Sequence, residues 1–362
     1  MKNNETLFNI RDLLQRPPDD KQFIYSEAES IIAGIATAFE SIGGTILNFL
    51  IIAALLRNMD LRKEYLTPPI ISIAIADFLH SIYTLPVMSL HFFTRDMPVT
   101  SCQFTGFLGY CVWFCSAWNL LGVSIIRFIA VYFPRKCKKE HFRRYSKILP
   151  IIAWIIPVFF FLPNLVGISG QFGLECKTIV CRYINIDSDG NTIKLDLDSM
   201  LSPIMMTMGG IMLLLNVATF IQISNERKKL TGHMENPNCE FTQKMLEKER
   251  KLGIMMATIS ILFFLVYCPT FLLHAVDPNA HITKTTASIV CYLMNWSIGI
   301  LDPVTYIICQ KNYRDEIKEI LRLIYACENP FKPSSDDLIL NPSFHKINIK
   351  ANGSITLDTI KE

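Results

Sequence analysis

The chain has 362 residues, of which 51% are hydrophobic and 19% are charged, and its mean hydropathy is +0.31. This composition is too apolar for a soluble chain of this length and indicates an integral membrane protein. The net charge of +3 is small for the size of the chain, so charge gives no reason to expect a nucleic-acid partner.

Seven stretches are apolar enough to cross a bilayer as helices, which takes about 20 residues each. They lie near 31–56, 68–92, 99–133, 147–167, 200–224, 252–275 and 284–309. Basic residues gather after the third stretch, between 135 and 144, and after the fifth, between 227 and 251. The positive-inside rule places such loops in the cytosol. We therefore expect an all-α bundle in the plasma membrane with its N-terminus outside and its C-terminus inside.

The chain divides into four predicted parts. These are an extracellular tail (1–30), a seven-transmembrane domain (31–310), an amphipathic helix on the membrane surface (311–327) and a disordered cytoplasmic tail (328–362). Asn4 begins an Asn-Glu-Thr acceptor for N-glycosylation. Apolar residues recur at helical spacing after position 311 and predict contact with membrane lipid. Cys327 at the end of that helix is a predicted palmitoylation site.

Three of the eleven cysteines, Cys102, Cys176 and Cys181, fall on the oxidising outer side of this topology. They allow one disulfide, which would tie the second outer loop to the start of the third span. Cys102–Cys181 is the favoured pairing, and Cys102–Cys176 stays open. Neither CxxC nor HExxH spacing occurs, so we predict no zinc site and no cofactor.

Arg127 interrupts the apolar run SIIRFIAVYFP. An arginine within a membrane span is costly and is by default a candidate functional residue. It follows Cys102 by 25 positions, about 37 Å of helix at 1.5 Å per residue, which is close to the thickness of the bilayer. Arg127 is therefore expected at the cytosolic mouth of the bundle. The plainer explanation is an arginine that reaches for water.

Most other predicted spans also carry a polar or helix-breaking residue. These residues are Asn48, Asp77, Trp154, Pro269, Asp302, Pro303 and Tyr306. Together with Arg127, in this order and spacing, they resemble the landmarks of the rhodopsin-like family of G-protein-coupled receptors. The resemblance covers about residues 30–326. It implies a receptor, not an enzyme, in which a ligand drives the sixth helix outward and a heterotrimeric G protein is activated. An arrestin-like partner would bind the phosphorylated tail.

The resemblance also implies roles in activation for single residues. Ile126, Arg127 and Phe128 stand where the family has Asp-Arg-Tyr, and Asp302, Pro303 and Tyr306 belong to its NPxxY motif. Because Ile126 cannot hold the arginine, the carboxylate of Glu249 is its expected partner. We therefore predict a loosely restrained receptor with basal activity. A solvated helix face is the other interpretation of Glu249. The toggle positions of the sixth helix are Phe263, Tyr267 and Pro269.

Two sites are implied inside the bundle. Asp77, Ser116 and Asp302 match the family's sodium pocket. The expected ligand pocket is Gly109, Tyr110, Trp113, Thr270, Phe271, His274, Tyr292 and Trp296. Gly109 stands where amine receptors carry an aspartate, and Trp296 stands where opsins carry a lysine. The aromatic lining suits a neutral, flat or lipid-like small ligand.

The segments GQFGLECKTIVC and VYCP resemble a group of arthropod receptors, moody and trapped-in-endoderm, which are themselves similar to melatonin receptors. In the fifth span either Ile211 or Asn216 stands at the family's usual tyrosine. A different class remains as the alternative, a secondary transporter that uses Asp77 and Asp302 to carry protons or sodium. It lacks support from internal repeats, which transporters usually show.

Overall fold

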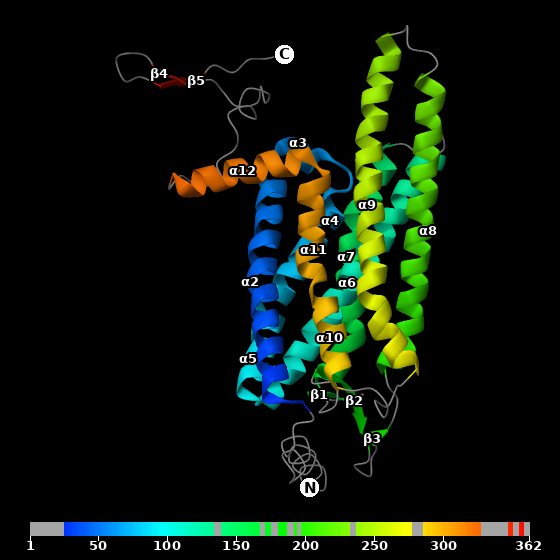
Figure 1. The fold of residues 1–362 in the computed structure, drawn as a ribbon. Helices are drawn as coiled ribbons and strands as arrows, with labels where there is room; N and C mark the ends of the chain where they lie inside the picture. The colour runs from blue at the N-terminus through cyan, green and yellow to red at the C-terminus, as the bar shows by residue number, and fades with distance from the viewer. Residues whose placement is uncertain are drawn as a thin grey trace.

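The computed structural model describes residues 25–133, 139–166, 171–174, 180–186, 192–193, 197–231, 237–276, 285–326, 347–349 and 355–357. Within these residues seven helices are long and apolar enough to cross a membrane, which confirms the predicted seven-helix bundle. They lie side by side in one bundle (Figure 1). In chain order they are α2 (Glu27–Arg57), the span from α4 to α5 (Thr67–Thr94), α6 (Val99–Tyr132), α7 (Lys139–Leu165), α8 (Leu197–Thr231), α9 (Pro237–Val276) and α10 with α11 (Thr285–Cys309).

Short elements distinguish the two ends of the bundle (Figure 1). The helices α3 (Met59–Lys63) and α12 (Lys311–Tyr325) lie at one end, where α12 runs crosswise to the spans, past α2 and out beyond the bundle. The strands β1 (Gln171–Leu174), β2 (Cys181–Ile186) and β3 (Thr192–Ile193) lie at the other. We call these the α12 end and the sheet end. Of residues 328–362 the structure describes β4 (Ile347–Ile349) and β5 (Ile355–Leu357), which form an antiparallel hairpin.

Local sequence determines where the first two spans begin and bend. The Ser26 hydroxyl accepts from the backbone N–H of Glu29 (3.2 Å), and the Glu29 carboxylate accepts from the N–H of Ser26 (2.7 Å). This capping box starts α2. The second span runs from α4 (Thr67–Leu79) through a π-helical turn, η1 (His80–Thr84), into α5 (Leu85–Thr94). Pro86, which has no backbone N–H, follows this wide turn. Turns of this kind occur frequently at functional sites.

The side chains are distributed as a bilayer requires. Phe39, Phe159 and Leu214 are each about 70% exposed, whereas Asn48 and Asn216 are fully buried. Apolar surface of this extent on a water-soluble protein would be an interaction or aggregation site. On a membrane bundle it is the lipid-facing surface, and the polar residues turn inward.

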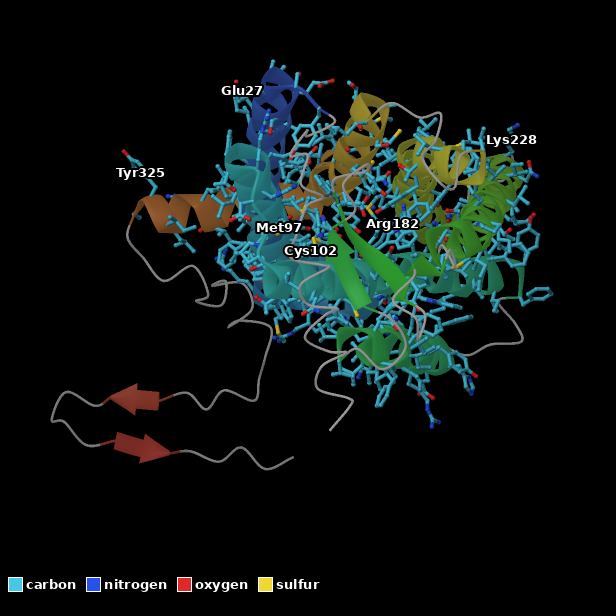
Figure 2. All side chains as sticks on the ribbon, turned by 90° about the horizontal axis from the view of Figure 1, so that it is seen from below. Glu27, Met97, Cys102, Arg182, Lys228 and Tyr325 are labelled. Carbon is cyan, nitrogen blue, oxygen red and sulfur yellow. A yellow bond between two sulfur atoms is a disulfide. The ribbon has the colours of Figure 1, made fainter. Side chains whose placement is uncertain are left out.

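A small sheet covers one end of the helices. β1 and β2 pair antiparallel, with Phe172 opposite Tyr183. A disulfide joins Cys102 at the start of α6 to Cys181 in β2, with 5.3 Å between their Cα atoms, as the favoured pairing predicted. Cys176 lies outside the described residues. Figure 2 looks onto this end, with Cys102 near the centre of the view and the strands across the helices. The sheet is therefore fixed over the mouth of the bundle.

Candidate functional site

A cavity extends from beneath β2 to the middle of the bundle. Seven of the eight residues predicted to contact a ligand line it, namely Gly109, Tyr110, Trp113, Thr270, Phe271, Tyr292 and Trp296. The side chain of the eighth, His274, lies outside the described part of the chain. The predicted pocket residues therefore share one space, although three different helices, α6, α9 and α10, contribute them.

One wall of the cavity is aromatic. The ring centroid of Trp113 lies 6.0 Å from that of Tyr267 and 6.1 Å from that of Phe271. Tyr267 stacks on Phe271 and has Phe263 4.6 Å away on its other side. A Cβ added at Gly109 would have no heavy atom within 4 Å. The wall is thus a continuous ring surface that joins the toggle positions to a hollow at Gly109.

Other lining residues carry polar atoms that the sequence patterns did not predict. His80 Nδ1, Thr84 Oγ1, Thr105 Oγ1 and Asn295 Oδ1 are buried and have no hydrogen-bond partner among the described residues. Each such atom costs about 1–3 kcal/mol if it stays unpaired. These residues therefore favour water or ligand groups that form hydrogen bonds. The sequence does show that His80 and Thr84 are polar residues after Asp77 in a largely apolar span.

The floor of the cavity holds the three predicted sodium ligands. The Ser116 hydroxyl donates to Asp77 Oδ1 over 3.4 Å, and Asp302 lines the same space. Asp77 Oδ2 and Asp302 Oδ1 are buried without a hydrogen-bond partner in the described residues. Carboxylate and hydroxyl oxygens are the donors that a hard cation prefers, so these groups fit sodium. Ile298 and Gly299 beside them provide no side-chain oxygen.

The inner landmark residues join helices to one another. Asn48 Nδ2 donates to the backbone oxygen of Gly299 (2.7 Å), which fixes α2 against α11. Ser72 Oγ accepts from Trp154 Nε1 and from Asn119 Nδ2, both at 3.1 Å. These bonds hold α4, α6 and α7 together. The polar residues that stand out in the sequence are therefore contacts between helices, as polar groups in membrane bundles commonly are.

Arg127 lies five residues before the end of α6, far along the helix from Cys102, and only 1% of its surface is exposed. Its Nη2 donates to the backbone oxygen of Glu249 on α9 (3.3 Å). Its Nε and Nη1 have no hydrogen-bond partner in the part of the chain that the structure describes. A Cβ at Gly253 would lie 3.3 Å from Nη2, so this glycine lets the arginine reach the backbone. Ile126 is 7% exposed and packs in the apolar core.

The other residues of the predicted activation set make separate contacts. Phe128 stacks on Tyr132 with 4.4 Å between ring centroids. Tyr306, next to the buried Pro303 turn of α11, stacks on Tyr313 of α12 at 6.1 Å. Phe128 thus pairs with a residue one turn along α6, whereas Tyr306 connects the seventh span to α12.

Three comparisons place this architecture among known proteins. The family described as "7 transmembrane receptor (rhodopsin family)" matches residues 47–306. The chain belongs to this family. Squid rhodopsin has the same fold, with a TM-score of 0.69, 19% sequence identity and coverage of 84% of this chain and 89% of that one. The protein is therefore a multi-pass receptor of the plasma membrane, and not an enzyme.

The curated relatives of this receptor agree with the narrower resemblance. "Protein trapped in endoderm-1" of Drosophila melanogaster is 22% identical over 340 residues, which cover 88% of this chain and 85% of the relative. "Melatonin receptor type 1C" of Xenopus laevis is 22% identical over 322 residues, which cover 84% of this chain and 71% of that receptor. Similarity to the trapped-in-endoderm and melatonin-receptor group is thus confirmed.

The two candidate residues in the fifth span of the receptor have different surroundings. Ile211 is 43% exposed on α8, whereas Asn216 is fully buried. Asn216 Nδ2 donates to Ser124 Oγ on α6 (2.9 Å) and to Ser260 Oγ on α9 (2.8 Å). Asn216 is therefore the residue that faces the third and sixth spans. The sequence left this open because Pro203 gives an ambiguous alignment of the helix.

A buried ion pair fixes α12 to the receptor. Arg57 Nη1 lies 2.9 Å from Glu316 Oε1, and the two side chains are 5% and 9% exposed. Asn58 Nδ2 donates to the other carboxylate oxygen at 2.9 Å. The predicted amphipathic helix is thus held to the end of α2 by charge as well as by apolar contacts.

Proposed function

We propose that this receptor binds a small or lipid-like ligand in the cavity beneath β2 and activates a heterotrimeric G protein. Activation would proceed by outward movement of α9, with the α12 end in the cytosol and the N-terminus outside the cell. The observation that carries the proposal is Arg127. It is buried beneath α9, it is held there by one hydrogen bond, and two of its nitrogens have no partner among the described residues. Movement of α9 would expose a guanidinium able to bind carbonyl groups of a partner helix.

The mechanism is a shift between two populations of the bundle. A ligand between Trp113 and Phe271 would contact Tyr267, which lies against Phe263. These aromatic residues of α9 are adjacent to the hollow at Gly109. Ligand contact with this wall can therefore favour one position of α9 over another. Only a ligand that binds the outward state more tightly would activate the receptor.

The lining indicates the chemistry of the ligand. Ring surfaces dominate one wall, and unpaired hydrogen-bonding groups lie elsewhere in the lining. The charged residues that line the cavity, within the described residues, are Arg182 at the sheet end and Asp77 and Asp302 at the floor. The middle of the cavity thus favours an uncharged, partly aromatic or lipid-like compound with a hydrogen-bonding edge.

Further partners follow from the ends of the chain. Ile324 is 46% exposed and Tyr325 is 93% exposed on α12, which supports contact with membrane lipid. Cys327, Asn4 and the tail residues Ser334, Ser335, Ser343 and Ser354 lie outside the described residues. Palmitoylation, glycosylation and arrestin binding at these positions remain predictions from the sequence.

The test is ligand-free activation of a panel of G proteins in cells. Wild type and Arg127→Ala are compared at matched surface expression, with Arg144→Ala, an exposed arginine of α7, as the control. We expect wild type and the control to activate at least one G-protein class and Arg127→Ala to lose that signal. Equal signals from wild type and Arg127→Ala would refute the role of this arginine.

A further inference from the structure

The position of α9 over Arg127 rests on little direct contact. Arg127 makes one hydrogen bond to the backbone of α9, at 3.3 Å. Ile126 has no charge with which to hold the arginine in place, and it packs in the core. A single long hydrogen bond is a weak restraint on a helix of 40 residues. Contacts beside it therefore add to the restraint on this part of α9.

One such contact is an ion pair made by Lys248, the residue that precedes Glu249 in α9. Lys248 Nζ of α9 is 2.6 Å from Glu64 Oε1, and their side chains are 62% and 30% exposed. Glu64 directly follows α3, in the loop between the first and second spans. Lys248 precedes Glu249, whose backbone oxygen accepts the hydrogen bond from Arg127. The loop and the arginine thus reach adjacent residues of the same helix turn.

The neighbouring tyrosine confirms how close the loop comes. Tyr65 packs its ring 6.3 Å from that of Phe142. Burial raises the pKa of the Tyr65 hydroxyl, and the negative charge of Glu249 raises it further, whereas the positive charge of Arg127 lowers it. Tyr65 is therefore within electrostatic reach of both residues that join α6 to α9.

The loop that carries Glu64 is itself firmly fixed. Asn58 Oδ1 accepts from the N–H groups of Asp60 and Leu61, each at 3.0 Å, and caps α3. Thr67 Oγ1 donates to the backbone oxygen of Leu61. Arg143 of α7 donates to the backbone oxygen of Lys63 at 3.2 Å. Three spans thus hold the loop in place, and an ion pair from it restrains α9 against a stationary support.

We propose that Glu64 and Lys248 are positioning residues that hold α9 in its inward place over Arg127. They do so in a chain whose Ile126 cannot restrain the arginine. The proposal rests on the function proposed above, in which inward and outward positions of α9 set the activity. An exposed ion pair can favour the inward position over the outward one by up to about fivefold. Two like charges at these positions would repel each other and shift the equilibrium toward the outward position of α9.

The test is a charge exchange with a conformational readout. Glu64→Lys, Lys248→Glu and the double variant are purified in lipid nanodiscs without ligand or G protein. Distances between spin labels on α7 and α9 give the outward fraction. We expect each single variant to raise this fraction two- to fivefold and the double variant to return it to the wild-type value. Lys251→Glu is the matched control, because Lys251 pairs within α9, with Glu247 at 3.9 Å.

The outcomes separate this inference from the proposed function. Single variants that leave the outward fraction unchanged, or a double variant that fails to restore it, would overturn the role of the pair. The wild type, the two single variants, the double variant and the control are also assayed for ligand-free G-protein activation. Restored distances in the double variant without any G-protein signal would support the pair and refute the proposed coupling. Ligand-free G-protein activation together with unchanged distances in the single variants would support the proposed coupling and refute the role of the pair.

Discussion

The buried hydrogen bonds of Asn216 predict a measurable effect on basal activity. Asn216 joins Ser124 on α6 and Ser260 on α9, at 2.9 Å and 2.8 Å. If α9 moves outward, the bond to Ser260 is lost. The bond to Ser124 joins two helices that stay packed. Ser260→Ala should therefore favour the outward state, whereas Ser124→Ala should leave the balance nearly unchanged.

The size of the effect follows from hydrogen bonds between membrane helices. Such bonds contribute about 0.6 kcal/mol on average and at most about 1.7 kcal/mol. Loss of about 0.6 kcal/mol from the inward state raises the ratio of outward to inward molecules about threefold. Asn216→Ala removes the same bond, so adding it to Ser260→Ala should produce no further rise beyond that of Asn216→Ala alone.

The assay is ligand-free G-protein activation at matched surface expression, with Ser124→Ala as the control. We expect an about threefold higher signal for Ser260→Ala. Unchanged or lower activity of this variant would refute the reasoning. Additive effects of Ser260→Ala and Asn216→Ala would also contradict it, because the two residues would then act independently.

Ile126→Asp should lower ligand-free signalling up to about fivefold, because the adjacent arginine has two unpaired nitrogens in the described structure; the same assay measures it, and the absence of any decrease counts against the idea. Gly109→Leu fills the hollow in the cavity and should weaken the first agonist found in a ligand screen at least tenfold, as the dose response shows. Gly210→Leu is the control, because a Cβ there also has no neighbour within 4 Å and Gly210 does not line the cavity; equal potency at both variants would place the ligand elsewhere. Glu316→Ala should lower the free energy of unfolding by about 3 kcal/mol, because it leaves a buried guanidinium. Adding Arg57→Met should restore most of it, and denaturation in micelles measures both; no recovery would contradict this account.

Much of the architecture follows from the sequence because membrane spans are long and strongly patterned. The third predicted span, 99–133, differs from the observed α6 by one residue at its end. Topology limits the disulfide to three cysteines on the outer side, and the structure shows that Cys102 pairs with Cys181. The aromatic pocket residues follow from family positions, which the fold preserves.

The missed features depend on geometry that the sequence does not carry. The π-helical turn at His80–Thr84 helps to place polar atoms in the cavity, and its wide turn cannot be derived from helical periodicity. The backbone contact between Arg127 and Glu249, close to Gly253, depends on how α6 and α9 pack, which no residue pattern in the sequence gives. Glu64 and Lys248 are far apart in the chain, and no short-range pattern connects them.

Outward movement of α9 on G-protein binding is the central claim, and a distance measurement tests it most directly. Nitroxide labels are placed through unnatural amino acids at Arg144 on α7 and Lys251 on α9, both exposed, which leaves the native cysteines unchanged. The receptor is measured in nanodiscs by pulsed electron paramagnetic resonance, with and without excess nucleotide-free G protein of the class that responds in cells. We predict a second population at longer distance that appears with G protein and disappears on addition of GTP. A distance distribution that stays the same with bound G protein would contradict the account.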